Sequence, residues 1–204
     1  MQNIAIVTGV LAGLLQLVGY YIYGKEVFSN HIKPNTASWG IWTFGSILET
    51  TSYMYLTNDL IKNLLPIVCS ISVVVLFVLC TIRAKFEKLT HWEIVITITD
   101  LVALIILSYY QSAMYANFLL IFSSILSFVP IFLHTWKKPE SENALPWYVW
   151  SLAYFFMSIT VLIRWNKWQD FLYPLSFFVL HLIIAFVAVD NKYRNKIWRF
   201  FKQI

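Results

Sequence analysis

An isolated carboxylate within a long apolar stretch is the residue of this chain best suited to chemistry. Glu49 has no other charged residue within eight positions on either side. A charge at membrane depth is costly, so such a carboxylate should face the interior of a helical bundle. There it could take up and release a proton or hold a cationic substrate. The alternative is a permanently protonated Glu that makes one interhelical hydrogen bond.

Glu49 belongs to a stripe of residues at three- and four-residue spacing, which places them on one face of a helix. The stripe consists of Asn35, Trp39, Trp42, Ser46, Glu49 and Tyr53. A second stripe follows 108 residues later and consists of Asn143, Trp147, Trp150, Tyr154, Met157 and Val161. We expect Trp42, Trp150 and Tyr154 to form the aromatic walls of a substrate site. We expect a cytoplasmic gate from Asn35, Trp39, Asn143 and Trp147, although an interfacial aromatic belt is the alternative for the two Trp residues.

Three more residues in apolar segments stand out. His181 lies between Leu180 and Leu182, where an imidazole could act with Glu49 as a proton relay or be a satisfied core histidine. Asp100 lies midway along another apolar segment, and we expect it to brace the two halves of the chain or an oligomer contact. Pro130 frees a backbone carbonyl within its segment and predicts a kink or hinge.

The composition places these residues in a membrane. Of 204 residues, 59% are hydrophobic and only 12% are charged, whereas soluble domains have about 25% charged residues. Segments of about 20 apolar residues are long enough to cross a bilayer as helices. The sequence predicts an all-α, polytopic membrane protein with seven such spans, at residues 4–23, 38–56, 63–82, 92–110, 115–135, 146–163 and 172–189. Residues 1–23 lack a basic n-region and a cleavage site, so we interpret them as the first span rather than a signal peptide.

The chain also resembles itself at an offset of 108 residues. Asn35, Trp39, Trp42, Asn58 and Pro66 align with Asn143, Trp147, Trp150, Asn166 and Pro174. An internal repeat of this kind is typical of membrane transporters. We therefore predict a 3+1+3 duplication, with a first three-helix repeat at 1–83, a linker helix within 84–111, a second repeat at 112–190 and a basic tail at 191–204.

The distribution of basic residues predicts the orientation. With seven spans, twelve of the fifteen Lys and Arg residues fall on one side, and Lys62, Arg164 and Lys167 fall on the other. The basic side should be cytoplasmic, so the amino terminus is expected outside and the carboxyl terminus inside. The net charge of +5 therefore does not indicate nucleic-acid binding. The basic tail is expected to lie on anionic lipid, and a bacterial inner membrane fits the size and the charge bias.

A short region of the second repeat resembles the PQ-loop motif of the SWEET and SemiSWEET sugar facilitators and of the lysosomal cystine and cationic amino-acid exporters. The resemblance rests on Ser127-Phe128-Val129-Pro130, Thr135-Trp136-Lys137 and Leu145-Pro146. It implies a three-one-three helical layout with the amino terminus outside. Ile131 stands where that family has Gln, and Ile22 and Tyr23 stand where the first repeat would have Pro-Gln. Glu49 lies near the depth at which SWEET-type pockets place a Trp, which favours proton coupling or an amine-bearing substrate over a sugar.

These observations predict a transporter that moves a small polar solute (an amino acid, an amine or a sugar) by alternating access. Glu49, together with His181, would either carry a proton or meet a positive group of the substrate. A receptor or scaffold on the same fold, and a facilitator of a vitamin such as nicotinamide riboside, are the alternatives. The sequence contains no HExxH motif and no cluster of metal ligands, so we expect neither an enzyme nor a cofactor. The sequence is also compatible with assembly of the chain into a homo-oligomer.

Overall fold

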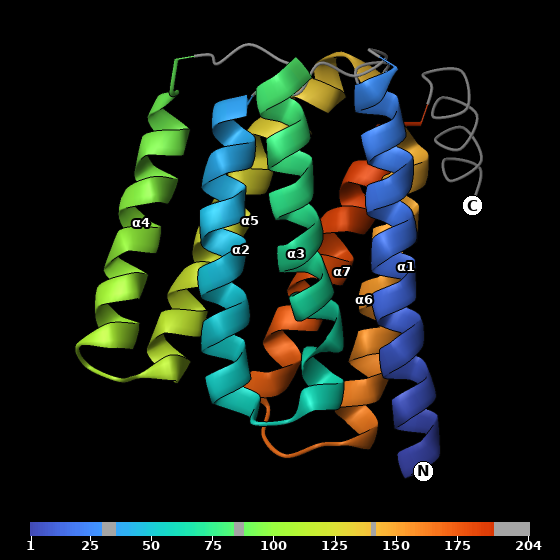
Figure 1. Ribbon diagram of the computed structural model, residues 1–204, viewed down its shortest axis with the longest axis vertical. Coiled ribbons are helices and arrows are strands. Elements are labelled where there is room, and N and C mark those ends of the chain that lie inside the picture. The colour runs from blue at the N-terminus through green and yellow to red at the C-terminus, as the bar shows by residue number, and fades with distance from the viewer. Residues whose placement is uncertain (30–35, 84–87, 140–141, 190–204) are drawn as a thin grey trace, which may run out of the picture.

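Seven α-helices form the whole of the regular structure in the computed structural model, which describes residues 1–29, 36–83, 88–139 and 142–189 (Figure 1). The helices are α1 (Gln2–Phe28), α2 (Thr36–Thr57), α3 (Leu60–Arg83), α4 (His91–Ser108), α5 (Ala113–Lys137), α6 (Ala144–Ile163) and α7 (Gln169–Val187). No strand occurs among these residues. The all-α prediction is confirmed, and each predicted span falls on one helix to within a few residues.

Six of the helices are long and apolar enough to cross a bilayer, which indicates an integral membrane protein. The exception is α2, because Thr, Ser and Glu49 take up much of its surface. Its polar side is covered by protein, since α2 packs against α3, α4, α5 and α7. The least apolar helix is therefore one of the most enclosed, as expected for the helix that carries the stripe around Glu49.

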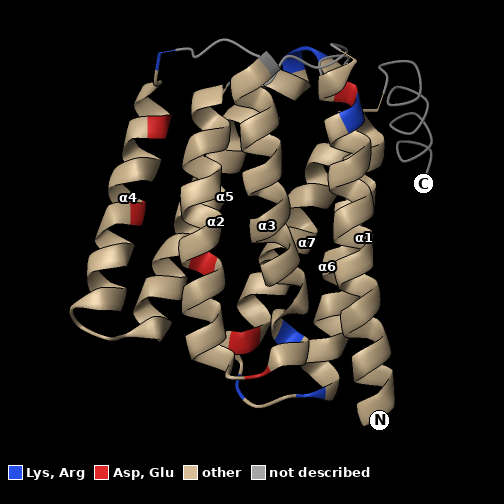
Figure 2. Ribbon diagram, viewed as in Figure 1, with Lys and Arg blue, Asp and Glu red and all other residues tan. Residues whose placement is uncertain are grey.

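The helices run alternately up and down (Figure 1). Charged residues are found mainly at the two ends of the bundle (Figure 2). One end, here called the amino-terminal end, contains the start of α1 and the links at residues 58–59, 109–112 and 164–168. Asn58 ends α2 there with φ 47°, a left-handed conformation that Asn tolerates. The other end, here called the opposite end, is the one predicted to be cytoplasmic.

The helix packing has a regular order. Among the first three helices, α3 contacts both α1 and α2, and among the last three, α7 contacts both α5 and α6. Between these groups α1 packs on α6 and α2 packs on α5, while α4 lies outside against α5 and α2. The centre of the bundle is therefore bounded by both groups of three helices.

Local sequence explains where two of the helices begin. A capping box of Thr90 and Glu93 starts α4, and the Asn143 side chain accepts a hydrogen bond from the Leu145 amide at the start of α6. Helix α5 continues through Pro130, so the predicted hinge is compatible with a continuous helix and stays a prediction.

Candidate functional site

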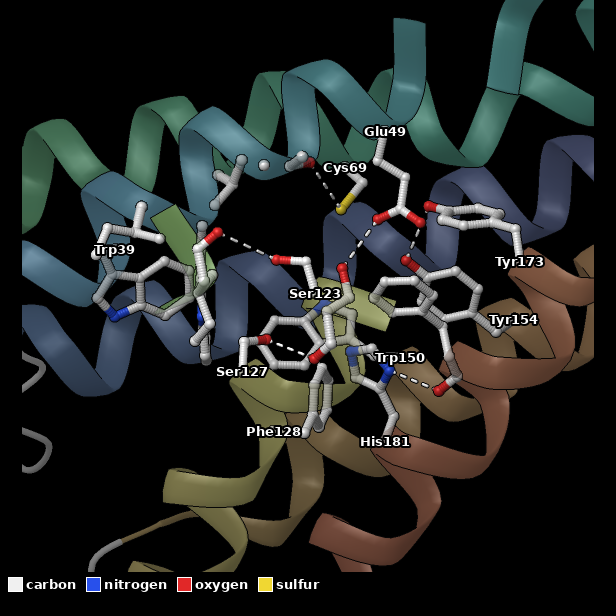
Figure 3. Close-up of a pocket in the computed structure, with 18 of the residues that line it drawn as sticks. Trp39, Glu49, Cys69, Ser123, Ser127, Phe128, Trp150, Tyr154, Tyr173 and His181 are labelled. Carbon is white, nitrogen blue, oxygen red and sulfur yellow. Dashed lines mark hydrogen bonds between the residues drawn. The ribbon is translucent and has the colours of Figure 1, made fainter. Parts of the chain in front are cut away.

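A cavity of about 90 Å³ lies at the centre of the bundle and is lined by residues of all seven helices (Figure 3). That volume is enough for several water molecules or a small solute. Of the predicted substrate-site residues, Trp42, Glu49, Trp150, Tyr154 and His181 all line it. Of the predicted gate residues, Trp39 and Trp147 also line it. The structure thus brings most of the predicted site together around one space.

The Glu49 carboxylate faces this cavity and is incompletely paired. Its side chain is 4% exposed, and the Ser124 hydroxyl donates a hydrogen bond to Oε2 at 3.2 Å. The other oxygen, Oε1, has no hydrogen-bond partner, and neither has Oε1 of Gln16, which also lines the cavity. Because an unpaired buried polar atom costs about 1–3 kcal/mol, two such acceptors beside a cavity indicate a place for water or for a ligand that donates hydrogen bonds.

Asp100 supplies a second carboxylate to the same cavity. A Cβ built on Gly45 would lie 2.9 Å from Asp100 Oδ2, so the absence of a side chain at Gly45 gives this carboxylate its place against α2. Glu49 follows Gly45 by four residues, about 6 Å along the helix axis. Among the described residues, no Lys or Arg contributes to the lining. The expected bracing role of Asp100 stays a prediction, and its place beside Glu49 was not foreseen.

Aromatic rings enclose His181 beside this cavity. Its ring centroid lies 5.1 Å from that of Tyr154, 5.2 Å from Phe128, 5.6 Å from Trp147 and 5.7 Å from Trp150. Nδ1 lies 2.7 Å from the Phe177 carbonyl oxygen. A carbonyl only accepts, so this geometry assigns a proton to Nδ1. The hydrogen bond of His181 is thus made within α7 rather than to Glu49, and the proposed relay between them stays a prediction.

Two Trp pairs form the wall towards the opposite end. The Trp39 and Trp42 rings pack edge to face with their centroids 5.1 Å apart, and the Trp147 and Trp150 rings pack in the same way with their centroids 5.2 Å apart. Trp39 is 5% exposed and Trp147 is 3% exposed. An interfacial aromatic belt requires exposure to lipid headgroups, so that alternative is wrong for these two residues.

Ionic contacts close the bundle at the amino-terminal end. Lys62 Nζ lies 2.6 Å from Asp170 Oδ2, with both side chains fully buried, and the Tyr53 hydroxyl donates to the Asp170 backbone carbonyl at 2.7 Å. Nearer the surface, Arg164 Nε lies 2.6 Å from Asp59 Oδ2. The Lys167 ammonium donates to the Leu56 carbonyl at 2.7 Å.

The position of Lys62 corrects an expectation from the sequence, which assigned it to a loop between two spans. Helix α3 begins at Leu60 because Asp59 accepts hydrogen bonds from the Ile61 and Lys62 amides. Lys62 therefore lies in the first turn of α3, where its ammonium reaches the interior.

Polar contacts also occur at the opposite end. Asn143 Nδ2 donates to Glu26 Oε1 at 3.3 Å, and Trp147 Nε1 donates to Glu142 Oε2 at 3.1 Å. Partial burial raises the pKa of Glu142, which lies outside the membrane-spanning helices, to about 7, and the hydrogen bond from Trp147 opposes this rise. The predicted gate residue Asn35 and the basic tail at 191–204 lie outside the described residues.

Sequence reasoning missed several lining residues. They are Gln16, Tyr20, Cys69, Asp100, Ser124, Tyr173 and Phe177. Gln16 and Asp100 carried a signal, because a polar residue within an apolar span tends to face the bundle interior. The others are ordinary residues of membrane helices, and only the packing of α1, α3, α5 and α7 shows which of them meet the cavity.

Comparison with known proteins finds no matching family model, no matching curated protein and no matching solved structure.

Proposed function

We propose that this chain is a membrane transporter that moves a small polar solute by alternating access between two three-helix halves. The observation that carries the proposal is the central cavity. It lies between the proposed halves and is lined by an incompletely paired carboxylate, and a buried ion pair joins the proposed halves at the amino-terminal end of the bundle. A fold that only needed stability would gain little from burying these groups.

The contacts support the 3+1+3 duplication. Lys62 and Asp170 are 108 residues apart, which is the offset of the sequence repeat, so the two positions are equivalent in the two halves. Equivalent positions meet each other only near the axis of a two-fold arrangement. The pairing of α1 with α6 and of α5 with α2 is what such an axis requires.

Smaller contacts follow the same correspondence. Adding 108 to Asp59 gives Lys167, and subtracting 108 from Arg164 gives Leu56. The Asp59–Arg164 ion pair therefore corresponds to the hydrogen bond between Lys167 and the Leu56 carbonyl. The Trp39–Trp42 pair corresponds in the same way to the Trp147–Trp150 pair.

In the proposed cycle, the halves rock about the cavity. Opening the amino-terminal end separates Lys62 from Asp170 and Arg164 from Asp59. Opening the opposite end separates the Trp39–Trp42 wall from the Trp147–Trp150 wall, with Asn35 and Asn143 assigned to the same gate. Pro130 would supply a hinge in α5. Glu49 carries a proton or meets a positive group of the solute, and His181 is assigned to the same site.

Flux in proteoliposomes tests the proposal. We expect at least one solute from a panel of sugars, amino acids, amines and nucleosides to show counterflow, and Glu49→Gln to reduce that counterflow or its dependence on a proton gradient. Gly24→Ala is the matched control, because a Cβ there meets only Leu76 Cδ1 at 3.9 Å. A solute that binds the purified protein but never crosses the membrane would contradict transport and favour a receptor.

A further inference from the structure

From the groups that line the cavity we infer that its ligand is a protonated alkyl amine without a carboxylate, held between Glu49 on α2 and Asp100 on α4. This inference deepens the proposed function and rests on it for the passage of that amine across the membrane. It assigns a ligand-binding role to the proposed linker helix α4, whose Asp100 had been expected to brace the two halves of the chain or an oligomer contact.

The charges of the lining favour a cation. Two carboxylates, Glu49 and Asp100, reach the same cavity, and no Lys or Arg among the residues that the structure describes lines it. Three basic side chains lie at the amino-terminal end, and none of them compensates these carboxylates. Lys62 and Arg164 pair with Asp170 and Asp59, and Lys167 donates to a backbone carbonyl. None of the described residues therefore supplies a cation to the cavity.

The unpaired atoms favour a hydrogen-bond donor. Glu49 Oε1 and Gln16 Oε1 are acceptors without partners, in side chains that are 4% and 1% exposed. A primary ammonium has three N–H donors and could donate to both. Trp42, Trp150 and Tyr154 line the same space, and their ring faces attract a cation.

The same lining disfavours a zwitterion. The carboxylate of an amino acid would lie near Glu49 and Asp100, and no Lys or Arg of the described lining would neutralise it. The cavity is also small, at about 90 Å³, which limits the ligand to a short chain. Gly45 matters here because it lets Asp100 approach within one helical turn of Glu49.

Equilibrium binding to the purified full chain tests this inference without requiring transport. The probes are putrescine and ethanolamine, with 1,4-butanediol as the neutral match of putrescine and 4-aminobutyrate as its zwitterionic match. We expect at least one of the two amines to bind, and the diol and the zwitterion to bind at least tenfold more weakly. Glu49→Gln and Asp100→Asn should each weaken amine binding at least tenfold.

Two further variants guard against misfolding. Gly45→Ala places a Cβ 2.9 Å from Asp100 Oδ2 and should weaken amine binding without removing either carboxylate. Ser108→Ala, at the exposed end of α4, is the matched control and should bind like the original chain.

The inference is overturned if no amine binds, if 4-aminobutyrate or a sugar binds more tightly than the amines, or if Asp100→Asn leaves amine affinity unchanged. An amine that binds but does not cross the proteoliposome membrane would contradict the proposed transport and would leave the proposed amine site standing. A sugar that the original chain and Asp100→Asn transport equally well would contradict the amine site and would leave the proposed transport standing.

Discussion

Lys62 and Asp170 form a fully buried ion pair, 2.6 Å between Nζ and Oδ2, at positions 108 residues apart. Lys62 lies in the first turn of α3, and Asp170 lies in the first turn of α7. The pair joins these two helices at the amino-terminal end of the bundle. Because its spacing equals the offset of the sequence repeat, this pair is the contact on which the proposed duplication depends most directly.

Removing one partner of this pair should destabilise the protein strongly. Lys62→Met or Asp170→Asn leaves a buried group without its partner, which typically costs about 3–5 kcal/mol. Thermal unfolding in detergent measures the loss. The partly exposed Asp59–Arg164 pair, whose side chains are 16% and 28% exposed, is the matched comparison, and Arg164→Gln should cost at most about 1 kcal/mol.

Exchanging the two charges tests the equivalence of the two positions. In a two-fold arrangement, Lys62→Asp combined with Asp170→Lys places the same pair across the same axis in reverse. We expect the double variant to recover most of the stability lost in either single charge reversal. A double variant no more stable than the worse single reversal would count against the duplication.

Gly19 should be irreplaceable for a packing reason. A Cβ there would lie 2.4 Å from Trp150 Nε1, so Gly19→Ala must push the indole out of the cavity wall. Overpacking of this kind typically costs about 1–3 kcal/mol. Gly24→Ala, in the same helix with its nearest contact at 3.9 Å, should be neutral. Equal melting temperatures for the two variants would show that the wall at Trp150 yields easily.

Glu49→Gln should separate proton coupling from exchange. The amide keeps the shape and most hydrogen bonds of the carboxylic acid but cannot take up or release a proton. We expect uptake driven by a proton gradient to be abolished and solute exchange at equal pH to persist in part. Uptake that retains its full pH dependence in this variant would rule out Glu49 as the proton carrier.

Glu142 should make stability depend on pH. Its pKa is raised to about 7 by burial, above about 4.3 for a free Glu, so the folded state binds the proton more tightly than the unfolded state. The stability that Glu142 contributes to the folded state is fully present below about pH 4 and is lost as the pH rises through 7. We expect Glu142→Gln to flatten the decline in melting temperature over that range. If the melting temperature of this variant fell with pH as steeply as that of the original chain, groups other than Glu142 would cause the decline.

The helices and much of the site could be predicted from the sequence because both depend on local pattern. The length of each apolar segment predicts a membrane span. The three- and four-residue spacing of Trp42, Glu49 and their counterparts in the second stripe predicts the helix face that points to the interior of the bundle. The position of Asp100 against Gly45 depends on how α4 packs on α2, which no local pattern encodes. The burial of Lys62 was missed because a charged residue near a span boundary resembles a loop residue until its partner on α7 is known.

Alternating access itself can be tested most directly at Cys69, because the labelling of a thiol needs no knowledge of the solute. Cys69 lines the cavity, and Cys80, the other cysteine of the chain, is buried elsewhere and can be replaced by Ala. A membrane-impermeant thiol reagent is applied to either side of sealed, oriented vesicles that contain this variant. We predict labelling of Cys69 from both sides, with Cys69→Ser as the blank. Labelling from one side only, or from neither, would contradict a cavity that opens alternately to the two sides of the membrane.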